Sequence, residues 1–423
     1  MIYIQYMKKE YALKMDDNDQ LSYLKKEFLY GDGNDSKKIY FCGNSLGLQH
    51  YSLKNKINKH LEQWKDLAVE NHFSGDYPWM DIQDKIKEKL KLFLGCSENE
   101  IAIMNSLTVN LHLMMVSFYK PSKTRNKILI EENAFSSDRY VVNSQLKYHG
   151  LDESSLITVS PEKDHLIDED KIISKINSNK ETLSLVLIPG IQYYSGQVIN
   201  ISKVSKVCRD NDIILGLDLA HMVGNVEIDL NSHDVDFATW CSYKYLNSGP
   251  GGVSGIYVNS KHIKDDIIRF EGWWGNKLSS RFEMLKKYDA EHSAEGWVLS
   301  NPPVILLDMH LASLEVFINA GLNNVFNKSK LLSDFLYEGL SSINNYNKFF
   351  DIITPKESTS RGSQISLFFK KSSEEFFSQI SKKFVVDYRK PNVVRVAPVP
   401  LYNSFYEVYL FVSEIDRIIK SYD

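Results

Sequence analysis

A lysine and an aspartate in the middle of the chain are the residues best suited to chemistry. Lys244 lies in a polar, glycine-rich stretch from Trp240 to Gly252, and Asp218 closes the apolar run from Ile213 to Leu217. A lysine amine can bond covalently to an aldehyde, and a buried carboxylate is costly unless a positive group pairs with it. For each residue taken alone, an exposed loop lysine and an ion-paired or helix-capping aspartate remain alternatives.

A helix start upstream offers donors for an anionic group. The apolar residues from Leu107 to Phe118 recur at helical spacing, and Asn105 and Ser106 precede them. The first amides of a helix lack partners within it and lie at the positive end of its dipole, so those near Leu107 and Thr108 suit a phosphate. Capping by Ser106 or Asn105 would explain the same pattern.

Together these groups match the needs of one cofactor, pyridoxal phosphate (PLP). A PLP enzyme requires an amine for the cofactor aldehyde, an anion that keeps the pyridine nitrogen protonated, and donors for the phosphate. Lys244, Asp218 and the helix start at Leu107 supply one of each. Phe135 adds an aromatic side chain that can stack on the ring. The pattern predicts a PLP enzyme of fold type I.

The apolar pattern also predicts the elements that position these groups. We expect strands at residues 128–130, 155–160, 183–188, 213–219, 237–241 and 253–258, alternating with helices at 137–148, 172–176 and 204–209. Apolar strands alternating with helices are typical of a parallel sheet covered on both faces. Ligands bind at the carboxyl ends of such strands. Phe135, Asp218 and Lys244 each lie at or just after a strand end.

The remaining sequence predicts a second, smaller unit. Amphipathic helices are expected at 306–319, 331–342 and 405–419, with short strands at 364–369, 384–388 and 393–396. This is the pattern of a small α+β domain. We therefore divide the chain into an N-terminal arm (1–55) that packs with the small domain, a large PLP-binding domain (56–305) and the small domain (306–423).

Composition argues against several functional classes. A formal net charge of -4 gives no electrostatic footprint for nucleic acid or an anionic membrane. No stretch approaches the roughly 18 apolar residues needed to span a bilayer, and the first residues lack the apolar core of a signal peptide. The four cysteines are widely scattered, which predicts neither a disulfide framework nor a metal site. We expect a cytoplasmic protein with a small-molecule substrate.

Several segments resemble kynureninase, the PLP hydrolase of tryptophan catabolism in the pathway that leads to NAD. They are Gly43–Gln49, Met104–Leu113, Asp218–His221, Val223–Asn225, Trp240–Gly252, Gly272–Gly275, Ser300–Pro303 and Arg395–Ser404. The similarity extends over nearly the whole chain. It implies an α/β, PLP-dependent transferase-like fold (fold type I), with a mixed, mostly parallel seven-stranded sheet between helices and a small α+β domain.

The resemblance also implies a role for each cofactor residue. Lys244 matches the lysine that bonds to PLP, Asp218 the partner of the pyridine nitrogen, and Tyr243 a phosphate ligand that helps to move protons. The full set matched to the cofactor is Leu107, Thr108, Phe135, Asp138, Asp218, His221, Tyr243, Lys244, Trp273 and Asn301. Trp273 and Asn301 match residues that reach a cofactor held mainly by the other subunit, which implies a homodimer.

Substrate contacts follow from the same resemblance. The positions matched to the substrate are Ser45, His72, Asn301 and Arg395. Arg395 matches the guanidinium that pairs with the substrate α-carboxylate. His72 and Asn301 match positions at the aryl end, where eukaryotic members prefer 3-hydroxykynurenine. Pro189 is a departure, because members of the family carry there a serine that contacts the cofactor, and proline has no side-chain donor.

The implied reaction is a hydrolytic cleavage of the substrate's Cβ–Cγ bond. Lys244 removes the α-proton, water adds to the γ-carbonyl, and (3-hydroxy)anthranilate leaves before alanine. Two alternatives are another fold-type I lyase, such as a cysteine desulfurase, and a PLP-binding protein without activity. A desulfurase needs a cysteine on a mobile loop, and no cysteine follows Cys241. Intact Lys244, Asp218 and Arg395 argue against an inactive protein.

Overall fold

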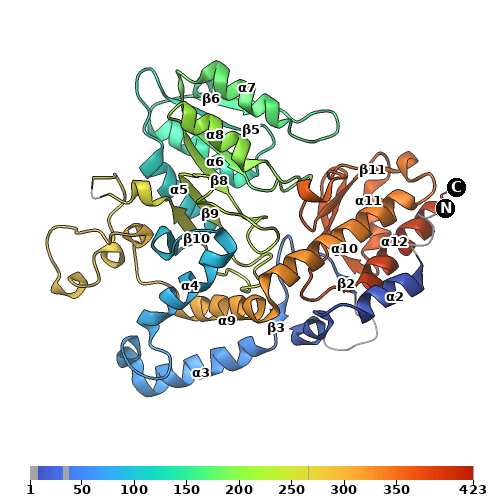
Figure 1. Ribbon diagram of the computed structural model, residues 1–423, viewed down its shortest axis with the longest axis horizontal. Coiled ribbons are helices and arrows are strands. Elements are labelled where there is room, and N and C mark those ends of the chain that lie inside the picture. The colour runs from blue at the N-terminus through green and yellow to red at the C-terminus, as the bar shows by residue number, and fades with distance from the viewer. Residues whose placement is uncertain (1–7, 32–37, 265, 423) are drawn as a thin grey trace.

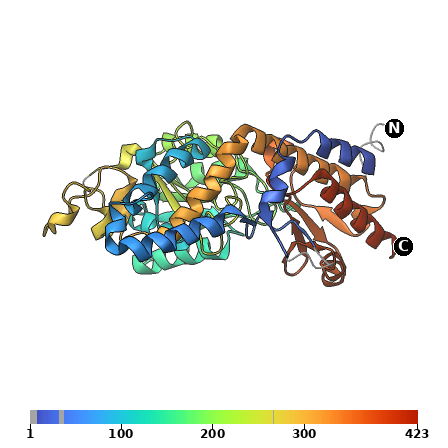
Figure 2. The same ribbon diagram turned by 90° about the horizontal axis from the view of Figure 1, so that it is seen from below.

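The computed structural model describes residues 8–31, 38–264 and 266–422. The chain forms a larger body around one sheet and a smaller body made mainly by its C-terminal part (Figures 1 and 2). Helix α10 (Leu322–Ser342) leads from the larger body into the smaller one. Helices α2 and α12, from opposite ends of the chain, lie side by side on the smaller body.

The larger body contains a seven-stranded sheet with the order β4-β10-β9-β8-β7-β5-β6. Strand β10 runs antiparallel to both β4 and β9, and the other pairings are parallel. The prediction of a mixed, mostly parallel sheet is therefore confirmed. The strands are β4 (Ile101–Ile103), β5 (Lys127–Glu131), β6 (Leu156–Val159), β7 (Leu183–Pro189), β8 (Ile214–Asp218), β9 (Phe237–Trp240) and β10 (Gly255–Val258).

Two layers of helices cover the two faces of this sheet. Alternate side chains of a strand point to opposite faces. Accordingly, Ile101 and Ile103 belong to an apolar core shared with α4, α7, α8 and α9, whereas Ala102 belongs to a core shared with α5 and α6. The helices are α4 (Ile82–Leu94), α5 (Leu107–Phe118), α6 (Ser136–Tyr148), α7 (Glu169–Asn179), α8 (Ile201–Asp210) and α9 (Val304–Ala320).

The smaller body has its own sheet and its own apolar core. Its antiparallel strands lie in the order β11-β12-β15-β14, and α10, α11 and α12 contribute to its core. The pairing of β14 with β15 places Asp387 directly opposite Arg395. The elements are β11 (Phe350–Ile352), β12 (Ile365–Phe369), β14 (Asp387–Arg389), β15 (Val393–Val396), α11 (Ser373–Ile380) and α12 (Phe405–Lys420).

Segments near the start of the chain pack on the smaller body. Helix α2 (Lys9–Asp17) lies along α12, and Asp16 accepts hydrogen bonds from the amides of Phe405 (2.7 Å) and Tyr406 (3.0 Å) at the first turn of α12. Strand β2 (Ile39–Tyr40) pairs in parallel with β13 (Phe384–Val385). The division at residues 55 and 305 stays a prediction, and residues 1–7 and 32–37 of the arm lie outside the described residues.

The chain then crosses to the larger body. Strand β1 (Phe28–Leu29) pairs with β3 (Gln49–His50), and α3 (Ser52–Leu67) packs along α9. Among the described residues, no single helix is long and apolar enough to cross a membrane; α9 and α10 satisfy length and composition only as a pair bent by 83°.

Several predicted elements have different boundaries in the structure. Helix α10 begins at Leu322 and not at Leu331, and α7 spans Glu169–Asn179 and not 172–176. The turns added to α7 are polar and carry no apolar period. At the start of α10, Leu322, Val325 and Phe326 do recur at helical spacing, but asparagines separate them and the prediction left them out. The strand expected at 384–388 is two strands, β13 and β14, which belong to different sheets.

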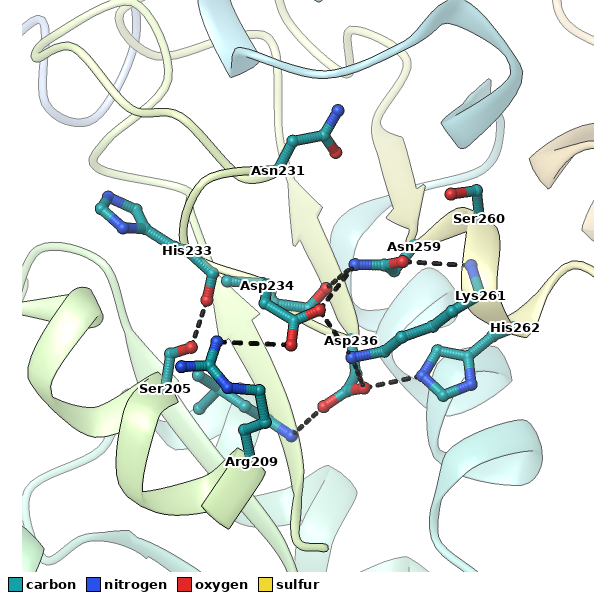
Figure 3. A network of polar contacts seen from close by, with 12 residues as sticks. Ser205, Arg209, Asn231, His233, Asp234, Asp236, Asn259, Ser260, Lys261 and His262 are labelled. Carbon is teal, nitrogen blue, oxygen red and sulfur yellow. Dashed lines mark hydrogen bonds and ion pairs between the residues drawn. The ribbon is translucent and has the colours of Figure 1, made fainter.

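A buried polar network ties β8 to β9 at the amino ends of these strands (Figure 3). Asp236 accepts a hydrogen bond from the Leu215 amide (2.8 Å), and its other oxygen lies 2.6 Å from His262 Nε2 and 2.9 Å from Lys261 Nζ. Burial alone would raise the pKa of Asp236, but the hydrogen bonds from His262, Leu215 and Lys261 hold it below its ordinary value. The ionised carboxylate therefore stabilises the pairing of β8, which carries Asp218, with β9, which precedes Lys244.

We predict that Asp236→Asn lowers the free energy of unfolding at pH 7 by about 2 kcal/mol, because hydrogen bonds to a buried charge are lost. A carboxyl group with a lowered pKa stabilises the fold above its ordinary pKa of about 4, and this contribution is lost as the pH falls further. The free energies of unfolding measured in urea should thus differ between variant and wild type at pH 7 and become similar at acidic pH. Asp210→Asn, which breaks the exposed pair with Lys206, is the control and should change stability by less than about 0.5 kcal/mol.

Candidate active site

A cavity opens at the carboxyl ends of β5, β7, β8 and β9. The predicted site residues that line it are Leu107, Thr108, Phe135, Asp138, Asp218, His221, Tyr243 and Lys244. They come from segments far apart in the sequence, and the parallel sheet brings them to one edge, as expected for this architecture.

A closely packed loop after β9 holds Lys244. The Gly47 amide donates to the Tyr243 carbonyl (2.8 Å), and the Asn247 amide donates to the Lys244 carbonyl (3.1 Å). A Cβ atom at Gly47 would lie 2.6 Å from the Lys244 carbonyl oxygen, so this approach requires glycine. The Lys244 ammonium lies 5.9 Å from the centroid of the Phe135 ring. Amine and aromatic ring are thus close together in the cavity.

Asp218 belongs to a cluster of buried acids. Its Oδ1 accepts a hydrogen bond from the Ala220 amide (2.7 Å), and its carboxyl is hydrogen-bonded to that of Asp138. Burial raises the pKa of Asp218, and the positive charge of Lys244 opposes this rise. Burial and the nearby Asp218 together raise the pKa of Asp138 well above its ordinary value. Burial also raises the pKa of Glu131 to about 7. Asp138 therefore holds the shared proton, and Asp218 carries the charge.

His221 lies in the same cavity as a neutral imidazole. Burial, together with the positive charges of Lys244, Arg395 and Arg389, holds the pKa of His221 well below its ordinary value. The ring can therefore pack against a cofactor without adding a positive charge.

Two helix starts meet at the cavity wall. Ser106 is the N-cap residue of α5, one of the two positions that the sequence suggested, but its side chain makes no capping hydrogen bond. Phe135, the N-cap residue of α6, has no side-chain acceptor, so the first turn of α6 is not capped by a side chain either. The hydroxyls of Thr108 and Ser137 lie 2.5 Å apart across the two first turns. Uncapped amides, helix dipoles and hydroxyls together make a site for a phosphate. Burial raises the pKa of Tyr243, which keeps its hydroxyl available as a donor.

Sequence reasoning assigned no individual role to some residues of the cavity. Ser137, Glu131 and Tyr193 line it, and the Tyr193 ring contacts the Phe135 ring edge-on, with centroids 5.2 Å apart. Each of these residues lies at or after the end of β5 or β7. Their position after a strand was a usable signal, but only the fold shows which of the residues in those loops point inward.

Arg395 and Ser45 lie behind the cavity wall. Arg395 is fully buried, and its Nη1 donates to the Tyr193 carbonyl (2.7 Å). Ser45 donates to Asp387 Oδ2 (3.0 Å). The structure thus brings Arg395 next to a residue of the cavity without placing either predicted residue in the cavity lining.

The structure places His72, Trp273 and Asn301 away from this lining. His72 Nδ1 lies 2.9 Å from the Val69 carbonyl, and Trp273 is 45% exposed with its indole donating to the Arg281 carbonyl (2.9 Å). Asn301 is exposed. Their predicted contacts with substrate or with a partner's cofactor stay predictions.

The chain is similar to kynureninases over nearly its full length. The model of the kynureninase C-terminal domain matches residues 325–415. A kynureninase of Christiangramia forsetii is 41% identical over 418 residues, covering 98% of each chain, and one of Rattus norvegicus is 39% identical over 431 residues, covering 97% of this chain and 93% of its own. The chain belongs to the kynureninase family. The resemblance inferred from the sequence is therefore confirmed.

Solved structures confirm the fold of this kynureninase family member. A cysteine desulfurase from Escherichia coli superimposes with a TM-score of 0.75 at 13% identity, covering 95% of this chain and 99% of its own. C-DES with glycine covalently linked to its PLP cofactor gives a TM-score of 0.74 at 14% identity, covering 89% of this chain and 96% of its own. At such identities the likeness concerns the fold alone, which is the predicted fold type I.

The residues of the cavity fit the PLP expected of a kynureninase family member. Lys244 offers the amine, Asp218 the buried anion, and the starts of α5 and α6 the phosphate donors. Asp138 Oδ1 is buried without a hydrogen-bond partner in the described part of the chain, so it is free to meet a polar ligand atom. Pro189 lines the cavity and offers no side-chain donor, as expected from its sequence.

We predict that Ser137→Ala weakens PLP binding by about tenfold, because a hydrogen bond to a charged phosphate contributes roughly 1.5 kcal/mol. Fluorescence titration of the cofactor-free protein with PLP measures this change. Ser144→Ala is the matched control on the same helix, since its hydroxyl bonds to the Tyr140 carbonyl on the exposed side. Equal affinities for all three proteins would exclude Ser137 from the phosphate site.

Proposed function

We propose that the chain is a PLP-dependent kynureninase that hydrolyses L-3-hydroxykynurenine, and L-kynurenine, to 3-hydroxyanthranilate or anthranilate and L-alanine. The observation that carries this proposal is the meeting of Lys244 and Asp218 in one cavity of a kynureninase family member. A role in tryptophan catabolism and a cytoplasmic location follow from the same proposal.

The residues of the chain perform the proton transfers of this reaction. PLP, when bound, supplies an aldehyde that reacts with amines and a ring that withdraws electrons from the attached amino acid. Lys244 would hold PLP through its aldehyde and, as a free amine, would remove the proton from the substrate α-carbon. Asp218 holds a proton on the ring nitrogen, and its burial strengthens that interaction by excluding water. Tyr243 helps to move protons beside Lys244.

The two ends of the substrate have separate partners in this proposal. Arg395 binds the α-carboxylate, a task for which the planar guanidinium is well suited. His72 and Asn301 contact the aryl ring and favour the 3-hydroxyl group. Fixing both ends orients the γ-carbonyl for attack by water and contributes to the rate through positioning.

Steady-state kinetics with both substrates tests the proposed function. The purified protein with PLP should cleave L-kynurenine and L-3-hydroxykynurenine, with the higher kcat/KM for the hydroxylated substrate. Lys244→Ala should abolish turnover, and borohydride should attach the cofactor to Lys244 in the wild type. Absence of turnover with both substrates would favour a PLP-binding protein without this activity. The reverse preference would remove His72 and Asn301 as determinants of specificity.

We also propose that the chain acts as a homodimer. The segment between β10 and α9, coloured yellow to gold in Figure 1, projects from the larger body on the side away from the smaller one. Its Phe282 is 49% exposed and contacts Trp273 and Phe73, with both pairs of ring centroids 5.7 Å apart. A clustered, exposed aromatic surface is typical of a protein interface. Trp273, expected at the partner's cofactor, belongs to this cluster.

We predict that Phe282→Asp converts the dimer into monomers, because a charge would be buried in the aromatic contact. Light scattering coupled to gel filtration gives the molar mass of each variant. Tyr148→Asp, at an exposed aromatic residue on α6, is the control and should leave the mass unchanged. A wild-type protein that is monomeric at micromolar concentration would contradict the proposal.

A further inference from the structure

Asp387 lies at the centre of a charged cluster in the smaller body. Its Oδ1 lies 3.0 Å from Arg395 Nε and 2.8 Å from Arg389 Nε. Its Oδ2 lies 2.9 Å from Arg395 Nη2 and accepts a hydrogen bond from Ser45 at 3.0 Å. One carboxylate is therefore shared by two guanidinium groups. Two positive charges and one negative charge leave a net charge of about +1 in the cluster.

Arg395 is held at two places and retains donors for a ligand. Asp387 accepts a hydrogen bond from Nε and lies 2.9 Å from Nη2, which is buried and makes no hydrogen bond within the described residues, and the Tyr193 carbonyl accepts from Nη1 at 2.7 Å. A guanidinium has five N–H bonds, so one N–H remains on Nη1 and the donors of Nη2 are not used in hydrogen bonds. Donors on these two neighbouring nitrogens suit the two oxygens of a carboxylate.

The cluster lies directly behind the cavity. Tyr193, which binds Arg395 through its carbonyl, lines the cavity and contacts Phe135 through its ring. The charges of Arg395 and Arg389 also act on His221, another residue of the lining. A negatively charged ligand group near Tyr193 would therefore meet the uncompensated positive charge of the cluster.

We propose that Asp387 is a positioning residue for recognition of the substrate α-carboxylate. It fixes one edge of Arg395 and keeps Arg389 beside it, so that a single net positive charge and two oriented donors remain for the ligand. This inference rests on the proposed function, in which Arg395 binds that carboxylate. It gives Ser45 a role as well, because the Ser45 hydroxyl donates a hydrogen bond to Asp387.

The test compares two amine ligands on the PLP-loaded enzyme. L-alanine carries a carboxylate and ethylamine does not, and both change the absorbance of the bound cofactor. We expect Asp387→Asn to weaken L-alanine binding by about tenfold or more, because Arg395 loses its charged partner and its orientation. Affinities for ethylamine and PLP should stay within about twofold, and KM for kynurenine should rise more than kcat falls.

Two further variants separate positioning from general destabilisation. Asp334→Asn removes the acidic partner of Arg361, another buried arginine of the smaller body, and should leave the ratio of L-alanine to ethylamine affinity unchanged. Ser45→Ala keeps all charges and should weaken L-alanine binding by about two- to threefold. Because Ser45→Ala is the milder substitution, it still tests the role of Asp387 if Asp387→Asn does not fold.

An unchanged ratio in both Asp387→Asn and Ser45→Ala would overturn the role of Asp387. So would a wild-type enzyme that binds L-alanine no better than ethylamine. A wild-type enzyme that shows the expected ratios but does not cleave kynurenine would contradict the proposed function and leave Asp387 as a determinant of amino-acid binding.

Discussion

The burial of a single negative charge at the end of β8 is the constraint on which the site depends. The Asp218 carboxylate is buried and loses its hydration. The Ala220 amide, the proton on Asp138 and the charge of Lys244 compensate for that loss. Burial raises the pKa of Glu131 to about 7 and the pKa of Asp138 well above its ordinary value, which limits the charge that the acid cluster accumulates. Asp218 supplies the anion that a protonated pyridine nitrogen requires.

A loop after β7 connects this charged pocket to the smaller body. Backbone carbonyls of Tyr193, Tyr194 and Ser195 accept hydrogen bonds from Arg395, Ser366 and Thr354, respectively. Tyr193 therefore contacts Phe135 through its ring while its backbone holds Arg395. The groups proposed for the cofactor and for the substrate carboxylate are set relative to each other by one short segment.

The sequence was sufficient to predict the sheet and the site residues at its edge where the local apolar pattern and the topology agree. Apolar strands alternating with helices predicted a parallel sheet, so residues after strands, such as Asp218 and Lys244, could be expected at one edge. Ser137 was missed because a serine at a helix start is equally typical of a cap. The contact of Asp387 with Arg395 depends on the register of β14 with β15. The sequence pattern predicted a single strand at 384–388, so it did not predict this pairing. Contacts of Trp273 with a second chain cannot be read from one sequence.

The two ends of the central strands serve different purposes. β8 carries Asp218 at its carboxyl end, and the Asp236 network joins this strand at Leu215, three residues or roughly 10 Å away. At that separation, substitutions at the two sites are expected to act additively. Heat tolerance and substrate range could therefore diverge independently among descendants of this chain, through separate sets of mutations on the same strands.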